Sequence, residues 1–291
     1  MISSINTDDR PTLAFLIPFA SRKVKSKWDI ACAHLQQTIR SIQNSSSGKY
    51  RVVVAGHEPP DFDFRFDSRL HFLSLNHPTP SDRNHAPALT LDKMTKIRAA
   101  WDYAKPTWNP RYVMKLDADD LVSSKLVGWL DNADDEAGYL ITHGWAWRSG
   151  SRYLLQRTEY FDRICGSCLI IRSDVADKTG PFLSDWDLVP SDEASSSLVA
   201  TNEHSASPGS RISSLLLNDA CARFAAQFAY LGYRLPIVPF SAVIYRTGNA
   251  DSYEGWILQR RRQTQTLRML AGGIRRTRFI TKALRQEFML G

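Results

Sequence analysis

Cysteine is scarce in this chain of 291 residues, and long apolar runs are missing from its sequence. Four cysteines agree with a reducing compartment, where disulfide frameworks are rare. No run of 18 or more apolar residues occurs, which argues against a membrane-spanning helix. Residues 1–11 are polar and lack the basic start and apolar centre of a signal peptide. We therefore expect a cytoplasmic protein.

Two cysteines, Cys165 and Cys168, have the spacing of a redox or zinc pair. A zinc site needs two further ligands, and the sequence has no second cysteine pair to supply them. A redox pair typically opens a helix, whereas this one runs into residues 169–171, which are apolar and typical of a strand. The pattern therefore argues against redox or zinc chemistry here, and Cys32 and Cys221 are expected in the core.

Positive charge is concentrated near the end of the sequence. The net charge is +7, and residues 256–291 hold nine Lys or Arg and one Glu, which gives +8 and leaves −1 for the remainder. A nucleic-acid-binding surface over the whole protein is therefore not expected. We predict two units, a folded domain over residues 1–250 and a basic helical tail over residues 251–291.

Within this tail, residues 274–290 carry an apolar stripe of Ile280, Leu284 and Phe288 at a spacing of four. Basic residues form a second stripe, which predicts an amphipathic helix suited to an anionic membrane surface. Such a location would be peripheral, at the inner membrane surface. The alternative is a helix that docks on the domain through its apolar stripe and leaves the cations in solvent.

Three acids follow a short apolar segment in residues 112–120. Asp117, Asp119 and Asp120 repel one another unless a cation lies between or beside them. Mg²⁺ and Mn²⁺ prefer such hard oxygen ligands, commonly one or two carboxylates with substrate phosphates. The carboxyl end of a strand in an open α/β sheet is also where ligands bind. The alternative is a turn in which Asp119 or Asp120 caps a helix over residues 121–130.

Strand-like and helix-like segments alternate through residue 130, which predicts a mostly parallel sheet covered by helices. Expected strands cover residues 13–17, 50–55, 70–75, 112–116, 139–142, 153–155, 167–171 and 237–245. Expected helices cover residues 31–42, 91–104 and 215–231, the last with Gly232 as its C-cap. Residues 184–214 are rich in Ser, Asp and Pro and are expected to form a long loop, a lid or an acceptor loop.

This order of elements resembles the GT-A fold glycosyltransferases, most nearly the family 2-like group, over residues 12–250. The resemblance implies an α/β, Rossmann-like nucleotide half with a mixed, mostly parallel central sheet flanked by helices. It also implies a nucleoside diphosphate sugar as donor, with UDP expected on family grounds, and a glycan or lipid-linked acceptor. The turn at Cys165, Gly166, Ser167 and Cys168 resembles the small-residue turn that precedes a strand beside the family's acceptor site.

The predicted donor site collects residues from several turns. Asp119 is expected to bind Mn²⁺ or Mg²⁺, Asp117 to reach the metal or the ribose, and Asp120 to cap a helix. The turn after the first strand, with Pro18, Phe19 and Arg22, could edge the nucleotide and its phosphates. The resemblance places the base at Glu58 and basic residues near the diphosphate, here Lys93 and Lys96, with Arg98 as a further candidate. Each of these cations could equally belong to a solvated face.

The predicted acceptor site is centred on Asp219, the usual general base in the family, which takes a proton from the acceptor hydroxyl. Two positions depart from the pattern. Asn218 stands where an acid is common, and no His follows His204, so that role falls to Arg246 or Asn249 or is empty. A sugar platform of His143, Trp145 and Trp147 competes with a buried aromatic cluster.

Two rival functions remain at this point. A haloacid dehalogenase-like phosphatase also has Asp-x-Asp after a strand, but Leu121 replaces the expected Thr or Val and the motif lies in mid-chain. A nucleotide-sugar-binding protein on a degenerate GT-A scaffold would explain Asn218 and the missing His. The main prediction is a metal-dependent, inverting glycosyltransferase.

Overall fold

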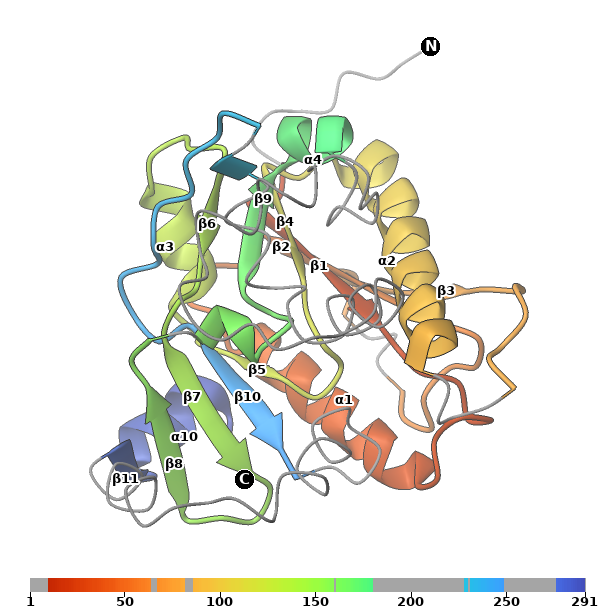
Figure 1. The fold of residues 1–291 in the computed structure, drawn as a ribbon, viewed down its shortest axis with the longest axis horizontal. Helices are drawn as coiled ribbons and strands as arrows, with labels where there is room; N and C mark the ends of the chain where they lie inside the picture. The colour runs from red at the N-terminus through yellow and green to blue at the C-terminus, as the bar shows by residue number, and fades with distance from the viewer. Residues whose placement is uncertain are drawn as a thin grey trace, which may run out of the picture.

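The computed structural model describes residues 10–63, 67–81, 86–159, 161–179, 228–229, 231–248 and 276–290. Within them the protein is a two-sheet α/β structure (Figure 1). Six strands form the first sheet in the order β3-β2-β1-β4-β9-β6. Their bounds are Leu70–Ser74 (β3), Tyr50–Gly56 (β2), Leu13–Pro18 (β1), Tyr112–Lys115 (β4), Leu169–Arg172 (β9) and Gly138–Leu140 (β6).

The first sheet is parallel over β1 to β4 and becomes mixed at β9. The parallel pairs are β2 with β3, β1 with β2 and β1 with β4, whereas β9 is antiparallel to both β4 and β6. Strand order and directions give the GT-A-type fold that the sequence predicts. The runs predicted at residues 13–17, 50–55 and 112–116 are confirmed, because each forms a buried strand of this sheet.

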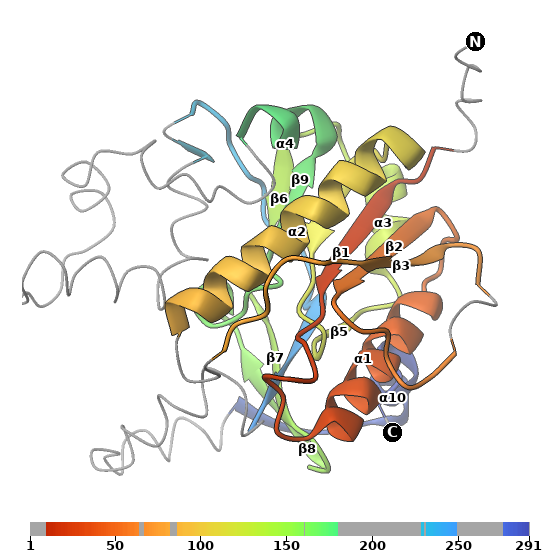
Figure 2. The same cartoon turned by 90° about the vertical axis from the view of Figure 1, so that its right-hand side faces the viewer.

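Two long helices contribute buried side chains to the main core cluster. Helix α2, Ala86–Trp108, lies along β1 and β2, as Figure 2 shows. It extends beyond the predicted residues 91–104 and includes Pro106 in its last turn. Helix α1, Trp28–Gln43, buries an apolar stripe that includes Leu35, Ile39 and Ile42. Its 3.6-residue period is the reason that this helix was predictable from the sequence.

The second sheet has the order β11-β8-β7-β10-β5. Its strands are Thr277–Phe279 (β11), Tyr153–Arg157 (β8), Gly144–Arg148 (β7), Val243–Thr247 (β10) and Leu121–Val122 (β5). The helix predicted over residues 121–130 is wrong, because Leu121 and Val122 pair with β10 and helix α3 begins only at Leu126 and ends at Asn132. The strand predicted over residues 237–245 is shorter than expected and shifted, since β10 begins at Val243 and Ile237 forms only an isolated bridge.

The last described segment closes the second sheet instead of forming one long helix. Strand β11 is followed by the short helix α10, Lys282–Phe288. Phe288 and Leu290 are buried with Leu121, Trp147, Leu154 and Ile244, and Ile280 and Leu284 pack against the same cluster. The predicted single helix over residues 274–290 is therefore wrong, and its apolar stripe is used inside the protein. The predicted boundary at residue 250 lies outside the described residues.

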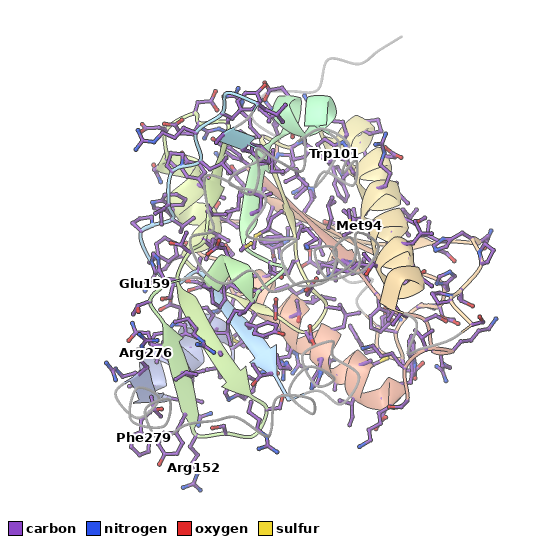
Figure 3. All side chains as sticks on the ribbon, in the orientation of Figure 1. Met94, Trp101, Arg152, Glu159, Arg276 and Phe279 are labelled. Atoms are coloured by element: carbon purple, nitrogen blue, oxygen red, sulfur yellow. The ribbon has the colours of Figure 1, made fainter. Side chains whose placement is uncertain are left out.

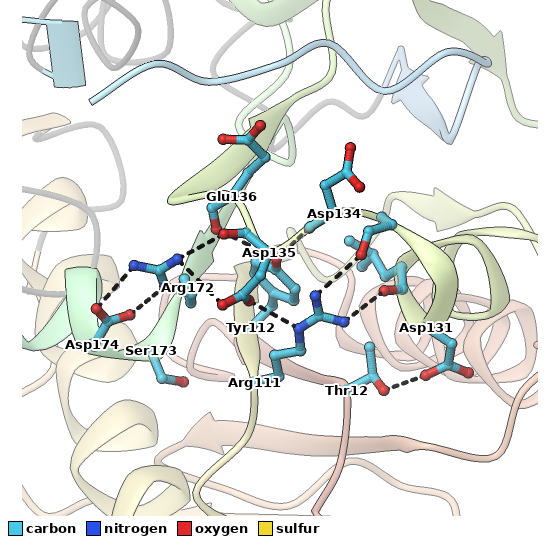
Figure 4. Close-up of polar contacts among 12 residues, drawn as sticks. Thr12, Arg111, Tyr112, Asp131, Asp134, Asp135, Glu136, Arg172, Ser173 and Asp174 are labelled. Atoms are coloured by element: carbon cyan, nitrogen blue, oxygen red, sulfur yellow. Dashed lines mark hydrogen bonds and ion pairs between the residues drawn. The ribbon is translucent and has the colours of Figure 1, made fainter.

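A network of ion pairs ties the amino end of β4 to its neighbours (Figure 4). Arg111 contacts Asp135 at 3.2 Å, and Arg172 contacts Asp174 at 2.6 Å. Asp135 also lies 3.6 Å from Arg172, so one acid bridges the two arginines. Asp135 is 66 % exposed, which marks this as a surface network.

Helix α4, Ser173–Thr179, and the short 3-10 helix Phe161–Arg163 complete the described elements around β9. No helix among the described residues is both long and apolar enough to cross a membrane. Gly232 has a φ of +78°, the left-handed value expected for a helix C-cap, although the helix predicted before it lies mostly outside the described residues.

Candidate active site at the carboxyl end of strand β4

The chain leaves β4 in a tight turn that carries the three acids. Leu116 still donates its N–H to Leu16 of β1, and the N–H of Asp120 then bonds to the carbonyl of Asp117 at 3.1 Å. The acids therefore lie at the carboxyl edge of the parallel strands, where α/β sheets bind their ligands. The side chains of the three acids differ in burial and in hydrogen-bond partners, so we describe them one by one.

Asp120 points inward and is fully buried. Its carboxylate accepts a hydrogen bond from the Ser167 hydroxyl at 2.7 Å, from the Cys165 thiol at 3.4 Å and from the Arg246 backbone N–H at 3.2 Å. Burial, then the charges of Asp119 and Asp117, raises the pKa of Asp120 well above its usual value. The prediction that Asp120 caps a helix is wrong, because this acid links three distant segments through its side chain.

Asp117 is held in its ionised form. Burial raises the pKa of its carboxyl, but the charges of Lys93 and Lys115 outweigh that effect and leave the pKa below its usual value. Lys93 Nζ lies 2.6 Å from Asp117 Oδ1, which joins helix α2 to the acid turn. The N–H of Asp117 donates to the Ser167 hydroxyl at 2.9 Å.

Gly166 gives the Asp117 carboxylate its space. A Cβ at this position would lie 2.8 Å from Asp117 Oδ2 and 3.1 Å from Lys115 Nζ, closer than side chains pack. The turn of small residues between Cys165 and Cys168 therefore packs directly against the Asp117 and Asp120 side chains. Both thiols are free and buried.

Arg246 braces the turn from the side of the second sheet. Its guanidinium donates to the Asp119 carbonyl at 2.9 Å, to Ser149 Oγ at 2.7 Å and to Gln37 Oε1 at 2.6 Å. It is 2 % exposed and stacks over Trp147 at 4.9 Å. Burial lowers the pKa of Arg246, and Asp119 and Asp120 oppose that effect. Arg246 was one of two residues considered for the missing His, and it does lie at the acid turn.

The turn after β1 is fastened to the end of β2. Pro18 ends β1 opposite Ala55, and the buried Phe19 donates its N–H to the Ala55 carbonyl at 2.8 Å. Glu58 accepts from Ser21 Oγ at 3.0 Å and from the Arg22 N–H at 3.2 Å. The Arg22 guanidinium pairs with Asp61 at 2.7 Å, in an exposed position. Roles for these residues toward a nucleotide stay predictions.

Lys93 and Lys96 have different partners although they lie on one helix. Lys96 is 1 % exposed, and its ammonium lies 2.5 Å from Asp92 Oδ2. Burial lowers the pKa of Lys96, which Asp92 opposes. Arg98 pairs with Asp102 on the exposed surface. Of the predicted phosphate-binding cations on this helix, Lys93 is the one that contacts the acid turn.

Asp92 also anchors a histidine pair. His77 Nε2 lies 2.9 Å from Asp92 Oδ1, and His57 Nε2 lies 2.9 Å from the His77 carbonyl. Ligand atoms of His57, His77 and Asp92 lie within 4.8 Å of one another, the closest grouping of metal-ligating side chains in the described ranges. Each of the three side chains has a hydrogen-bond partner within this group or in Lys96, so we assign them to a hydrogen-bonded network, in which the buried Nδ1 of His57 has no partner.

A divalent metal at the acid turn would have Asp117 and Asp119 as its protein ligands. Asp120 is withdrawn into the interior, so the three carboxylates do not surround one ion. Two carboxylates with substrate phosphates and water are nevertheless a ligand set that Mg²⁺ and Mn²⁺ use. Asp117 and Asp119 thus have the donor type that such a metal requires, and metal binding at this turn stays a prediction.

Several predicted residues have other positions. Trp147 is 4 % exposed and donates to the Ser151 carbonyl at 3.1 Å, so the buried aromatic alternative is confirmed for this ring. Trp145 packs against the same cluster, and His143 is half-buried. Asp219, Asn218, Asn249 and residues 184–214 lie outside the described residues. Ser167 and Gly166 were not singled out individually from the sequence, although the small-residue turn that contains them was.

The comparison with known protein sequences identifies no family for this chain. No family model matches the chain, and no curated protein matches it. Among solved structures it is similar to S. aureus TarS 1-349, with 13 % identity over 81 % of this chain and a TM-score of 0.44. A longer S. aureus TarS structure gives 12 % identity over 85 % of this chain and a TM-score of 0.46. The chain spans 60 % and 38 % of these two proteins.

Proposed function

We propose that this protein is a metal-dependent, inverting glycosyltransferase. It would move a sugar from a nucleoside diphosphate sugar, UDP-linked in the first instance, to a glycan or a lipid-linked acceptor. The observation that carries the proposal is the position of Asp117 and Asp119 directly after the carboxyl end of β4, with Lys93 Nζ 2.6 Å from Asp117 Oδ1. Carboxylates for a metal and a cation for phosphate thus meet at the ligand-binding edge of a GT-A-type sheet.

On the donor side, Asp117 and Asp119 would hold Mn²⁺ or Mg²⁺. The metal supplies positive charge that stabilises the departing nucleoside diphosphate. Lys93 would exchange part of its contact with Asp117 for the diphosphate. Pro18 and Phe19 would border the nucleotide through their backbone, and Glu58 would contact the base. Lys96 is proposed to act indirectly, because its ion pair holds Asp92 of the same helix in contact with His77, and this contact helps to position the helix that carries Lys93.

On the acceptor side, Asp219 would act as general base. It would take the proton of the acceptor hydroxyl while that oxygen attacks the anomeric carbon and the bond to the diphosphate breaks. Such a single displacement inverts the configuration at the anomeric carbon. General bases of this kind contribute rate factors of about 100 to 10,000.

A second candidate is a nucleotide-sugar-binding protein without transfer activity. The Lys93–Asp117 ion pair favours it, because an ammonium 2.6 Å from Asp117 already neutralises a carboxylate that the metal would use. The phosphatase alternative requires a haloacid dehalogenase-like fold, and the GT-A-type sheet removes its support. Two measurements bear on the remaining functions: the metal dependence of nucleotide binding, and the transfer of a sugar. Sugar transfer distinguishes the two, because the binding protein would not transfer a sugar.

Calorimetry with UDP, with and without Mn²⁺, tests the donor site, after a thermal-shift panel of UDP, GDP, CMP and dTDP selects the nucleotide. Asp119→Asn should abolish the Mn²⁺-dependent part of the affinity and leave the melting temperature nearly unchanged. An unchanged Mn²⁺-dependent affinity in this variant would refute the metal assignment. Asp219→Asn should keep donor affinity and lower turnover at least about 100-fold. Turnover within a few-fold of wild type would leave Asp219 without a role as base.

A further inference from the structure

A groove of about 700 Å³ lies between helix α1 and the C-terminal helix α10, on the side of the molecule where β7 ends. Its volume falls in the range of small-molecule sites in proteins. Arg40 contributes from α1, and Lys282 and Arg285 contribute from α10. Ala33, Met289 and Leu290 add apolar surface. Trp147 and Arg246, which were discussed for the candidate active site, also line this groove, whereas Asp117, Asp119 and Lys93 do not.

The described lining of the groove is cationic and contains no Asp or Glu. Glu287, the acid of α10, is turned away and contacts Ser123 at 2.6 Å and Lys125 at 2.8 Å. Within the described ranges, neither Arg40 nor Lys282 has an acidic partner. Burial, followed by the charges of Arg246 and Lys25, lowers the pKa of His34 in this lining to about 4, which agrees with a positive local potential.

The walls of the groove are fixed to each other by hydrogen bonds. Gln37 donates to the Met289 carbonyl at 3.1 Å, and Asn44 donates to the Gln286 carbonyl at 2.6 Å. The apolar side of α10 is anchored by Phe288 in the second core cluster. The cations of α10 are therefore presented by a helix that cannot turn away, and the site is preorganised.

We propose that this groove binds a phosphate-bearing ligand, with its phosphates on Arg40, Lys282 and Arg285 and its body against Met289 and Leu290. Guanidinium groups match phosphate oxygens with paired hydrogen bonds, and lysine adds a compact positive charge. Lys282 and Arg285 are three residues apart and lie on one helix face, opposite Arg40. The apolar surface of Met289 and Leu290 can contact a sugar or a hydrocarbon part of the ligand. A bare anion would leave this part of the groove unfilled.

Titration of the full chain with sodium tripolyphosphate, followed by calorimetry, tests the proposal. The double variant Arg40→Gln, Lys282→Gln should weaken binding about 25-fold, at about fivefold for each charge. Arg152→Gln is the matched control, since this exposed arginine lies at the tip of the second sheet (Figure 3) and its side chain does not line the groove. Equal affinities of wild type and double variant, or an equal loss in the control, would overturn the proposal.

The same titration in Asp119→Asn separates the groove from the candidate active site. Binding to the groove should be unchanged there, so this proposal stands or falls independently of the glycosyltransferase function. The melting temperature of the double variant should stay near wild type, because the side chains of Arg40 and Lys282 are exposed. A loss of tripolyphosphate binding in Asp119→Asn as large as in the groove variant would place the anion at the acid turn and refute the groove.

Two sources of phosphate are then distinguished. Vesicles with phosphatidylglycerol that bind wild type, fail to bind the double variant and are displaced by tripolyphosphate identify a phospholipid headgroup. Binding of tripolyphosphate without binding of such vesicles identifies a soluble phosphate compound. In either case affinity should fall as salt rises, because the Debye length shortens from about 10 Å at 0.1 M. A poly-glutamate peptide that binds as tightly as tripolyphosphate would contradict the phosphate assignment.

Discussion

Strand β4 has charged residues at both ends, and these residues differ in solvent exposure and in how their charges are balanced. At the amino end, Arg111 and Arg172 share Asp135 in a surface network of opposite charges (Figure 4). At the carboxyl end, Asp120 is fully buried and Asp117 is half-buried, with 21 % of its side chain exposed, and the charge of each acid is balanced in a different way. Lysines keep Asp117 ionised, whereas burial favours the protonated form of Asp120.

The difference shows that solvent exposure decides what an acid beside a strand can do. Exposed pairs of opposite charge gain little because water screens them. Buried charges are costly, so the carboxyl end must supply cations, hydroxyls and backbone N–H groups from distant segments. As a result, one turn holds a carboxyl with a lowered pKa and a carboxyl with a raised pKa. Such perturbed pKa values are common at functional sites.

The largest expected effect comes from removing the buried cation of the carboxyl end. Arg246→Leu should lower the free energy of unfolding by about 3 to 5 kcal/mol, because it removes a buried positive charge near Asp119 and Asp120 and leaves the Asp119 carbonyl, Ser149 and Gln37 without their donor. Arg172→Leu, at the amino end, should cost at most about 1 kcal/mol. Urea unfolding of both variants measures the contrast. Similar losses would mean that burial does not separate the two ends.

The next effect concerns pH. Because the pKa of Asp120 is raised in the folded protein, its contribution to stability is complete below the unfolded pKa and is lost as pH rises through the folded value. Asp120→Asn cannot titrate and keeps an oxygen acceptor. The difference in unfolding free energy between Asp120→Asn and wild type should therefore shift in favour of the variant by about 1 to 3 kcal/mol from pH 4 to pH 8. This is the typical cost of a buried polar group without a full set of partners.

Asp135→Asn is the control for this pH series, since Asp135 is exposed at the amino end. Its stability relative to wild type should change little over the same range. Urea unfolding at pH 4, 6 and 8 gives the comparison. A parallel pH dependence of wild type and Asp120→Asn would show that Asp120 is ionised throughout.

The smallest effect tests the space behind the acids. Gly166→Ala should destabilise the protein by about 1 kcal/mol, at the low end of overpacking, since its Cβ meets the movable ends of Asp117 and Lys115. At Gly48, near the amino edge of the sheet, a Cβ would lie 3.8 Å from Arg69 Nη1, so Gly48→Ala should stabilise the protein by up to about 1 kcal/mol. Thermal unfolding of both variants decides the point, and a stabilising Gly166→Ala would contradict the close fit.

Local patterns predicted much of the first sheet. The apolar runs before Pro18 and before the acids become β1 and β4, and the helical period before Gln43 becomes α1. These elements depend on burial of a continuous or periodic apolar face, which neighbouring residues in the sequence already encode. The prediction of a GT-A-type fold rested on their order.

Long-range contacts explain what the sequence did not reveal. Leu121 begins a segment with helical spacing, yet it pairs with Ile244, which no local pattern indicates. Asp120 has the sequence context of a cap, but its partners are Ser167 and Arg246. The stripe on α10 was recognised correctly as apolar, and only the tertiary structure identifies the cluster that it covers.

The pairing of β11 with β8 has a consequence for synthesis of the protein. Glu287 bonds to Lys125 across 162 residues of sequence, and Thr277 pairs with Leu155. While a ribosome is still making the intervening residues, the edge of β8 and the apolar cluster around Trp147 have no cover. Exposed strand edges recruit other chains, so nascent chains that stall before residue 277 should bind chaperones more strongly than completed chains. Equal chaperone retention of stalled and completed chains would show that the second sheet forms without its last strand.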